Sequence, residues 1–190
     1  MSVFTNAASS SPAETAAYVS AVLGLIEGQE PLAVLRRTPS WLNEVVEEMG
    51  GDAVYVPEAA GKWSVNEVVQ HLADSELVFG WRIRLVLAHD RPTITGYDQD
   101  RWAERLRYAE GNPHDAIERF AVLRRSNVKL LERASAADLQ RIGVHAERGE
   151  ETLAHIIRLY AGHDLLHVRQ IERIRKLPTS NAQLPIQRKP

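Results

Sequence analysis

Apolar side chains recur with a helical period along almost the whole chain, and no run of alternating β-branched residues predicts a strand. At the start of the chain the pattern predicts a helix over 12–27. Helical spacing resumes over 32–37, and Pro39 begins another short piece that ends near residue 50. Because prolines and a glycine interrupt this region, we expect its helix to be segmented.

A second helix is predicted from Ser64 to about residue 89. Ser64 and Glu67 have the spacing of a capping box, and Trp63 with Val68 can form a hydrophobic staple. A short helix over 98–110 is expected next, with Trp102 and Leu106 on its inner face.

Two further long helices complete the pattern. Asn112 is a candidate cap with Pro113 in the first helical position, and this helix extends to about Ala134. Thr152 is a plausible cap for the last long helix, which ends before Pro178. The predicted fold class is therefore all-α, a four-helix bundle with a segmented first helix and short extra helices.

A chain of 190 residues fits one domain with its own core. We expect this domain over 12–177, between a flexible N-terminus over 1–11 and a flexible C-terminal tail over 178–190. The longest mostly apolar run, 16–26, is too short for a membrane span of roughly 20 residues. The first residues lack the basic and apolar order of a secretory signal, so a cytoplasmic protein is expected.

The net charge and the absence of cysteine limit which partners and which kinds of site the chain can have. Lys and Arg total 23 against 25 Asp and Glu, so no overall field favours nucleic acid or an anionic membrane. Cysteine is absent, which excludes disulfides, thiolate metal ligands and a cysteine nucleophile. A small-molecule substrate is the expected partner, and a homodimer is left open.

Two histidines stand out in the last helix, in the stretch YAGHDLLHVRQ. His163 and His167 lie about 40° apart on the apolar face, one turn from each other. Such a pair can direct two nitrogens at one metal ion. The alternative is a pair of core histidines, each satisfied by a carbonyl or a carboxylate.

His71 is the third candidate ligand. It lies at the margin of the apolar stripe on the second helix, beside Ser75. If it meets His163 and His167, three neutral nitrogens on two helices leave coordination positions open for water or substrate. That set suits zinc, nickel or another late first-row divalent ion, and open coordination is typical of catalytic sites.

Several other polar residues are candidates for catalytic or structural roles near these three histidines. Glu76 falls within the core stripe, so it is either a catalytic proton carrier or the partner of an arginine, such as Arg82 or one on another helix. His145, in the loop before the last helix, is a candidate catalytic residue over the pocket mouth. Asp74 and Asp164 are expected to point outward as surface or inter-helix hydrogen-bond acceptors.

Neighbouring side chains have supporting roles. Gln170 can bond the second nitrogen of a ligand imidazole, and Tyr160 either presents its phenol near the ion or belongs to the core. His155 is expected at the surface. The tryptophans Trp63, Trp81 and Trp102 are expected to pack.

The segments KWSVNEVVQHLADSE and GVHAERGEETLAHIIRLYAGHDLLHVRQIERI resemble the DinB-like superfamily of damage-inducible four-helix bundles, which includes bacillithiol- and mycothiol-dependent transferases. The resemblance covers about residues 18–176. In that superfamily three histidines hold a divalent metal, and they match His71, His163 and His167. Ala146 departs from the family pattern, which has proline there.

The resemblance implies a metal-dependent enzyme, foremost a thiol-dependent S-transferase acting on small electrophiles. Since the chain has no thiol, a low-molecular-weight thiol would have to be a cofactor. The alternatives are a hydrolase that uses metal-bound water, and a non-enzymatic metal-binding bundle of the stress response.

Overall fold

The computed structural model describes residues 11–177. The expected C-terminal tail and all but one residue of the expected N-terminal segment lie outside this range. That residue, Ser11, is the N-cap of α1, where its Oγ accepts a hydrogen bond from the Glu14 amide.

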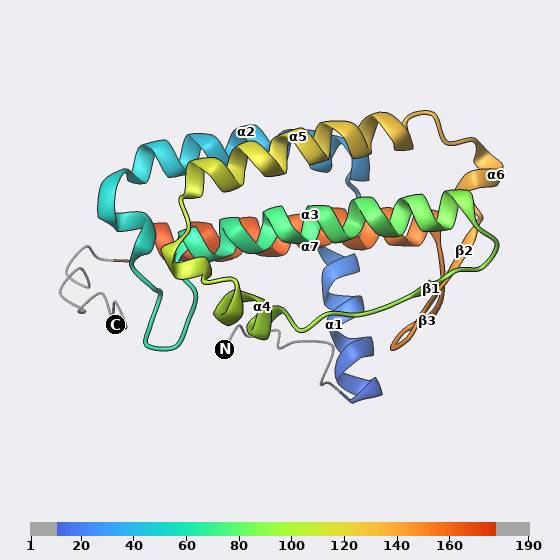
Figure 1. Cartoon of the computed structure of the whole chain (residues 1–190), viewed down its shortest axis with the longest axis horizontal. Coiled ribbons are helices and arrows are strands. Elements are labelled where there is room, and N and C mark those ends of the chain that lie inside the picture. The colour runs from blue at the N-terminus through green and yellow to red at the C-terminus, as the bar shows by residue number, and fades with distance from the viewer. Residues whose placement is uncertain (1–10, 178–190) are drawn as a thin grey trace.

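Four long helices form the bundle, as Figure 1 shows. They are α2 (Pro31–Met49), α3 (Val65–Ala88), α5 (Pro113–Leu131) and α7 (Leu153–Arg175). In cyclic order α3 packs on α5, α5 on α2, α2 on α7 and α7 on α3. The all-α four-helix bundle expected from the sequence is thus confirmed.

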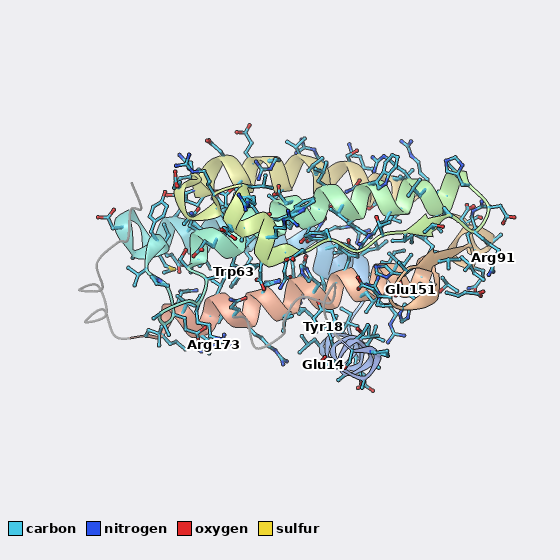
Figure 2. All side chains as sticks on the ribbon, turned by 60° about the horizontal axis from the view of Figure 1, so that its bottom comes forward. Glu14, Tyr18, Trp63, Arg91, Glu151 and Arg173 are labelled. Atoms are coloured by element: carbon cyan, nitrogen blue, oxygen red, sulfur yellow. The ribbon has the colours of Figure 1, made fainter. Side chains whose placement is uncertain are left out.

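Shorter elements surround the bundle. Helix α1 (Pro12–Leu25) crosses α7, and Figure 2 shows it nearly end-on beneath that helix. The others are η2 (Gly51–Tyr55), β1 (Thr93–Ile94), α4 (Gln99–Arg105), η3 (Tyr108–Glu110), α6 (Ala136–Leu139), β2 (Ile142–His145) and β3 (Gly149–Thr152). Within 11–177, every helix is too short or too polar to span a lipid bilayer.

The starts of the three later long helices follow the predicted caps. Ser64 Oγ accepts from the Glu67 amide at 3.3 Å, and Glu67 Oε2 accepts from the Ser64 amide at 2.8 Å. Asn112 and Thr152 cap α5 and α7 with their side-chain oxygens. Local hydrogen bonding at the caps thus fixes where these helices begin.

The expected break at Pro39 is wrong, because α2 continues through this residue. Proline has no N–H to bond the carbonyl four residues earlier, which here belongs to Leu35. Arg124 of α5 donates its Nη1–H to that carbonyl at 2.8 Å. A neighbouring helix therefore supplies the hydrogen bond that the proline cannot make.

A small sheet is a second difference, since no strand was expected. β1 pairs with β2 in parallel, and β2 pairs with β3 in an antiparallel hairpin that contains Gly149 at φ 78°. Strands of two to four residues are too short to show an alternating pattern. The sheet places His145 on a strand instead of in a loop.

Two residues that were expected to pack, and the helix expected over 98–110, also differ from the prediction. Trp81 on α3 is 63% exposed and Leu106 after α4 is 57% exposed, so the expectation that both pack in the interior is wrong. Helix α4 ends at Arg105, and Arg107 turns the chain with φ 57°. Trp102 lies against Tyr97, with ring centroids 4.5 Å apart.

Candidate metal centre

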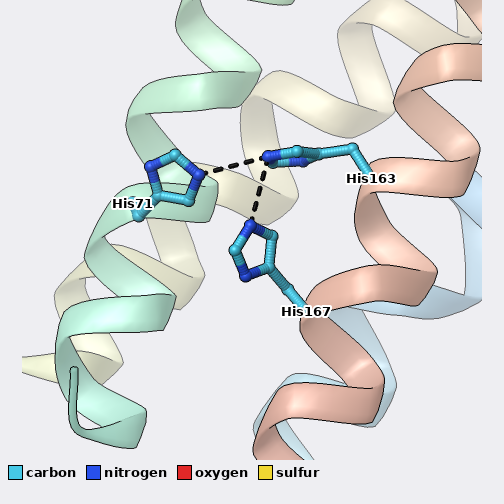
Figure 3. Close-up of side chains that lie close together, drawn as sticks. All are labelled: His71, His163 and His167. Atoms are coloured by element: carbon cyan, nitrogen blue, oxygen red, sulfur yellow. Dashed lines mark hydrogen bonds between the residues drawn. The ribbon is translucent and has the colours of Figure 1, made fainter. Parts of the chain in front are cut away.

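Three histidines meet between α3 and α7, as Figure 3 shows. The Nε2 atoms of His71 and His163 are 3.1 Å apart, and those of His167 and His163 are 3.2 Å apart. His71 and His167 are buried, while His163 is partly exposed. The two helices therefore bring together the three residues that the sequence singled out.

The spacing of these nitrogens suits a common metal ion. Zinc lies about 2.0–2.1 Å from histidine nitrogens, and tetrahedral geometry then separates two ligand nitrogens by about 3.3 Å. Burial lowers the pKa of His71 and of His163 well below the ordinary value, and lowers the pKa of His167 to about 4. The rings are consequently neutral at pH 7, the state in which imidazole binds a metal.

Gln170 fixes the orientation of one of these rings, as predicted. Its Oε1 lies 2.9 Å from His167 Nδ1. Because an amide oxygen only accepts, Nδ1 carries the proton and Nε2 presents a lone pair to the other histidines. His71 Nδ1 has no hydrogen-bond partner in the described part of the chain, and the Trp63 ring packs 5.0 Å from the His71 ring.

Two hydroxyl groups beside the histidines were missed as site residues. Ser75 Oγ lies 3.3 Å from His71 Nε2 and 2.8 Å from the Tyr97 hydroxyl. Ser75 is one helical turn after His71, so its spacing could have identified it. Tyr97 comes from the segment after β1, and nothing in its sequence surroundings indicates that it reaches α3.

Glu76, predicted as a catalytic candidate, lies in a buried ionic network. Arg124 Nε donates to Glu76 Oε2 at 2.8 Å, and Asn127 Nδ2 donates to Oε1 at 2.7 Å. Both carboxylate oxygens are thus engaged. The alternative weighed from the sequence, an arginine partner, is confirmed with an arginine on another helix.

Asp164 was expected to point outward, and this is wrong. It is 1% exposed and accepts from Arg124 Nη1 at 2.6 Å. Helix α7 is covered by α1 and α2 as well as by α3, so a position to the side of the histidine face is still inside the molecule. Asp74, by contrast, accepts from the Tyr108 hydroxyl at 2.7 Å, which confirms it as an inter-helix acceptor.

His145 lies on β2 and is 2% exposed. Its Nδ1 accepts from the Glu147 amide at 3.2 Å, while its Nε2 has no partner among residues 11–177. Burial lowers the pKa of His145 to about 4, so the ring is neutral at pH 7. His155 is partly exposed on α7, 3.8 Å from a Glu151 oxygen.

Tyr160 belongs to both the core and the surroundings of the site. Its ring stacks on Phe79 at 3.9 Å and lies 6.3 Å from the His163 ring, centroid to centroid. Its hydroxyl accepts from Arg82 Nη1 at 3.2 Å. The phenol therefore links an arginine to the edge of the histidine cluster.

Comparisons with known proteins agree with this arrangement. A protein from Bacillus cereus and one from Bacillus thuringiensis, both named "Putative metal-dependent hydrolase", are each 31% identical over 138 residues, covering 73% of this chain and 79% of the relative. The structure of YfiT from Bacillus subtilis, described as a probable metal-dependent hydrolase with an unusual four-helix bundle topology, superposes with a TM-score of 0.72 at 27% identity. That match covers 77% of this chain and 84% of YfiT. The profile of the DinB superfamily matches residues 35–171, and the chain therefore belongs to the DinB superfamily.

Proposed function

We propose that this chain is a hydrolase that depends on a divalent metal ion held by His71, His163 and His167, with zinc or nickel as the ion. The observation that carries the proposal is the approach of three neutral Nε2 atoms to 3.1 and 3.2 Å. The names of the relatives, which refer to metal-dependent hydrolysis, support the same reaction class.

The chemistry of such a site follows from its ligands. A divalent ion with three neutral histidine ligands lowers the pKa of a bound water and can polarise the substrate group to be cleaved. Gln170 keeps His167 in the tautomer that presents Nε2. The hydroxyls of Ser75 and Tyr97, beside His71, are placed to hydrogen-bond a substrate in the open positions.

Thiol transfer remains a prediction and is the competing reaction of the same site. It needs a thiol supplied as a cofactor, because the chain has no cysteine. A small-molecule substrate, a cytoplasmic location and a role in the stress response are further parts of the proposal. A homodimer is not required by it.

The first experiment measures metal content and turnover together. Untagged protein, purified without chelator or nickel resin, is analysed by elemental mass spectrometry beside His71→Ala and His163→Ala. His155→Ala on the surface of the same helix is the matched control. About one equivalent of metal is expected in the parent and the control, and much less in the two site variants.

Turnover of a panel of esters and amides then separates the reactions. Metal-dependent hydrolysis that is lost in His163→Ala supports the proposal. Conjugation of a bimane electrophile with bacillithiol or mycothiol, without hydrolysis, would favour the transferase instead. Metal retention without either activity would favour the non-enzymatic bundle, and a metal-free parent after reconstitution would overturn the metal site.

A further inference from the structure

Arg82 is a buried cation without a carboxylate partner in the part of the chain that the structure describes. It is 7% exposed, and no Asp or Glu in the described range lies within ion-pair distance of it. Its Nη1 donates to the Tyr160 hydroxyl and its Nη2 to the Thr95 carbonyl at 2.7 Å, both neutral acceptors. Its Nε has no partner among residues 11–177.

Arg124, the other buried arginine discussed above, has the carboxylate partners that Arg82 lacks among residues 11–177. Arg124 is buried to a similar degree and is bonded to two carboxylates, Glu76 and Asp164. Buried charges in proteins are normally paired in this way, because an isolated charge loses its hydration without compensation. Arg82 therefore has the environment of a cation whose counter-ion lies outside residues 11–177.

Arg82 also lines a groove of about 470 Å³ between α3 and the segment from β1 to α4. The walls are mostly apolar, with Leu77 and Trp81 from α3 and Trp102 from α4. Arg82 is the only charged side chain among the described residues that line this groove. A ligand that fits it has an apolar body and a single negative charge.

The groove and the histidine cluster are joined through two tyrosines. Tyr97 lines the groove, and its hydroxyl bonds Ser75, which lies 3.3 Å from His71 Nε2. Tyr160 connects Arg82 to the neighbourhood of His163. Arg82 is the last of the groups that lower the pKa of His163, after burial, the other two histidines and Arg124.

A second buried donor that has no acceptor among the described residues lies near the same arginine. His145 pairs with Ile94 in the sheet, next to Thr95, and its unpartnered Nε2 carries the ring proton because Nδ1 accepts. Burial, then Arg148 and then Arg82, lower the pKa of His145. Two buried donors in this region, Arg82 Nε–H and His145 Nε2–H, thus lack an acceptor among residues 11–177.

We infer that Arg82 binds the carboxylate of the substrate, whose apolar body lies in the groove along α3 and whose reacting group reaches the histidine centre. A monoanionic carboxylate is favoured over a phosphate dianion because the groove offers one cation. The substrate class is therefore a small organic acid with an apolar chain or ring. That such an acid is a substrate rests on the proposed hydrolase function. That Arg82 binds an organic anion does not rest on it.

The binding test uses two carboxylates, octanoate and phenylacetate, and their neutral amides as probes. Trp81 and Trp102 line the groove, so their indole N–H signals in proton–nitrogen NMR spectra report occupancy, with assignment from Trp81→Phe and Trp102→Phe. We expect the carboxylates to shift both signals and to bind about tenfold or more tightly than the amides. Equal binding of acids and amides, absence of binding, or preference for inorganic phosphate would overturn the inference.

Arg82→Gln keeps hydrogen-bond donors and removes the charge. It should abolish the preference for the carboxylate and leave amide binding unchanged. Arg101→Gln is the matched control, since it removes an exposed charge beside Trp102 without touching the groove lining. If Arg82→Gln does not fold, Arg82→Lys serves as second variant, which should retain the preference in weakened form.

A kinetic experiment on metal-loaded protein tests whether a substrate bound at Arg82 reacts at the histidine centre. The monophenyl ester of adipic acid, which carries a free carboxylate, is compared with its neutral methyl phenyl diester. Arg82→Gln should raise KM for the acidic ester about tenfold with little change for the neutral one. If octanoate binds at Arg82 but the protein holds no metal, the anion site stands and the hydrolase proposal fails.

Discussion

At the scale of single residues, Arg124 joins three helices of the bundle. From α5 it bonds Glu76 on α3, Asp164 on α7 and the Leu35 carbonyl on α2. Burial opposes its charge, but Asp164 and Glu76 together raise the pKa of Arg124 above its usual value. Arg124 is the one cation that these two buried carboxylates share, so the network holds the helices next to the histidine centre in one arrangement.

Replacing Arg124 by methionine should therefore destabilise the protein strongly. Two buried carboxylates would lose their cation, and breaking such a buried pair costs about 3–5 kcal/mol. The free energy of unfolding in urea measures this. Arg125→Met, the exposed neighbour, should change it by less than about 0.5 kcal/mol. A small effect for Arg124→Met would mean that the network does not support the fold.

At the scale of elements, the contact between α1 and α7 depends on a glycine. A Cβ at Gly162 would lie 2.3 Å from the Val22 carbonyl oxygen and 2.7 Å from Val22 Cγ1. Backbone therefore blocks any side chain at this position, one residue before His163. The close crossing places α1 directly against the helix that carries two of the histidines.

We predict that Gly162→Ala separates α1 from α7 and destabilises the fold by about 1–3 kcal/mol, as overpacking does. Hydrogen exchange should show faster exchange of α1 amides. Gly24→Ala is the matched control, because its Cβ would meet nothing within 4 Å. Gly24→Ala should stabilise helix α1 by about 0.5–1 kcal/mol, because alanine is a better helix former than glycine. Equal stability and equal hydrogen exchange in Gly162→Ala and Gly24→Ala would contradict the close contact between α1 and α7.

At the scale of the whole molecule, the histidine cluster connects two neighbouring long helices. His71 lies on α3, and His163 and His167 lie on α7. An ion held by all three would bind only the folded bundle, since His71 and His163 are 92 residues apart in the sequence. Metal affinity and the stability of the bundle are then linked.

Zinc in hundredfold excess over its Kd should raise the free energy of unfolding by about 2.7 kcal/mol, and a chelator should reverse this. Calorimetry with and without metal measures the change in Tm. His163→Ala should abolish the metal effect, whereas His155→Ala should retain it. A metal effect that persists in His163→Ala would locate the ion elsewhere in the protein.

Several parts of the fold and the site could be predicted because their cause is local. Ser64 and Glu67 determine the start of α3 through hydrogen bonds within four residues. His163 and His167 share a face through helical spacing alone, and Gln170 follows from the same geometry. These features need no information about neighbouring helices.

Other features depended on partners that are distant in sequence. Asp164 is buried because other helices cover α7, and α2 continues through Pro39 because Arg124 takes the free carbonyl. Trp81 is exposed although its helix is largely buried. For Asp164 and Pro39 the neighbour comes from another part of the chain, and for Trp81 no other element within 11–177 covers the side chain; one sequence reveals neither.

The starts of α3, α5 and α7, their caps and the shared face of the histidine pair could be derived from the sequence, since these follow from propensity, spacing and hydrogen bonds within a turn. The packing of the bundle, by contrast, brings His71 to that pair, binds Glu76 to Arg124 and Asn127, and leaves Arg82 without a carboxylate partner among residues 11–177. The physical reason is that these properties belong to contacts between helices. Such contacts are set by how the bundle packs, not by the order of residues within any one helix.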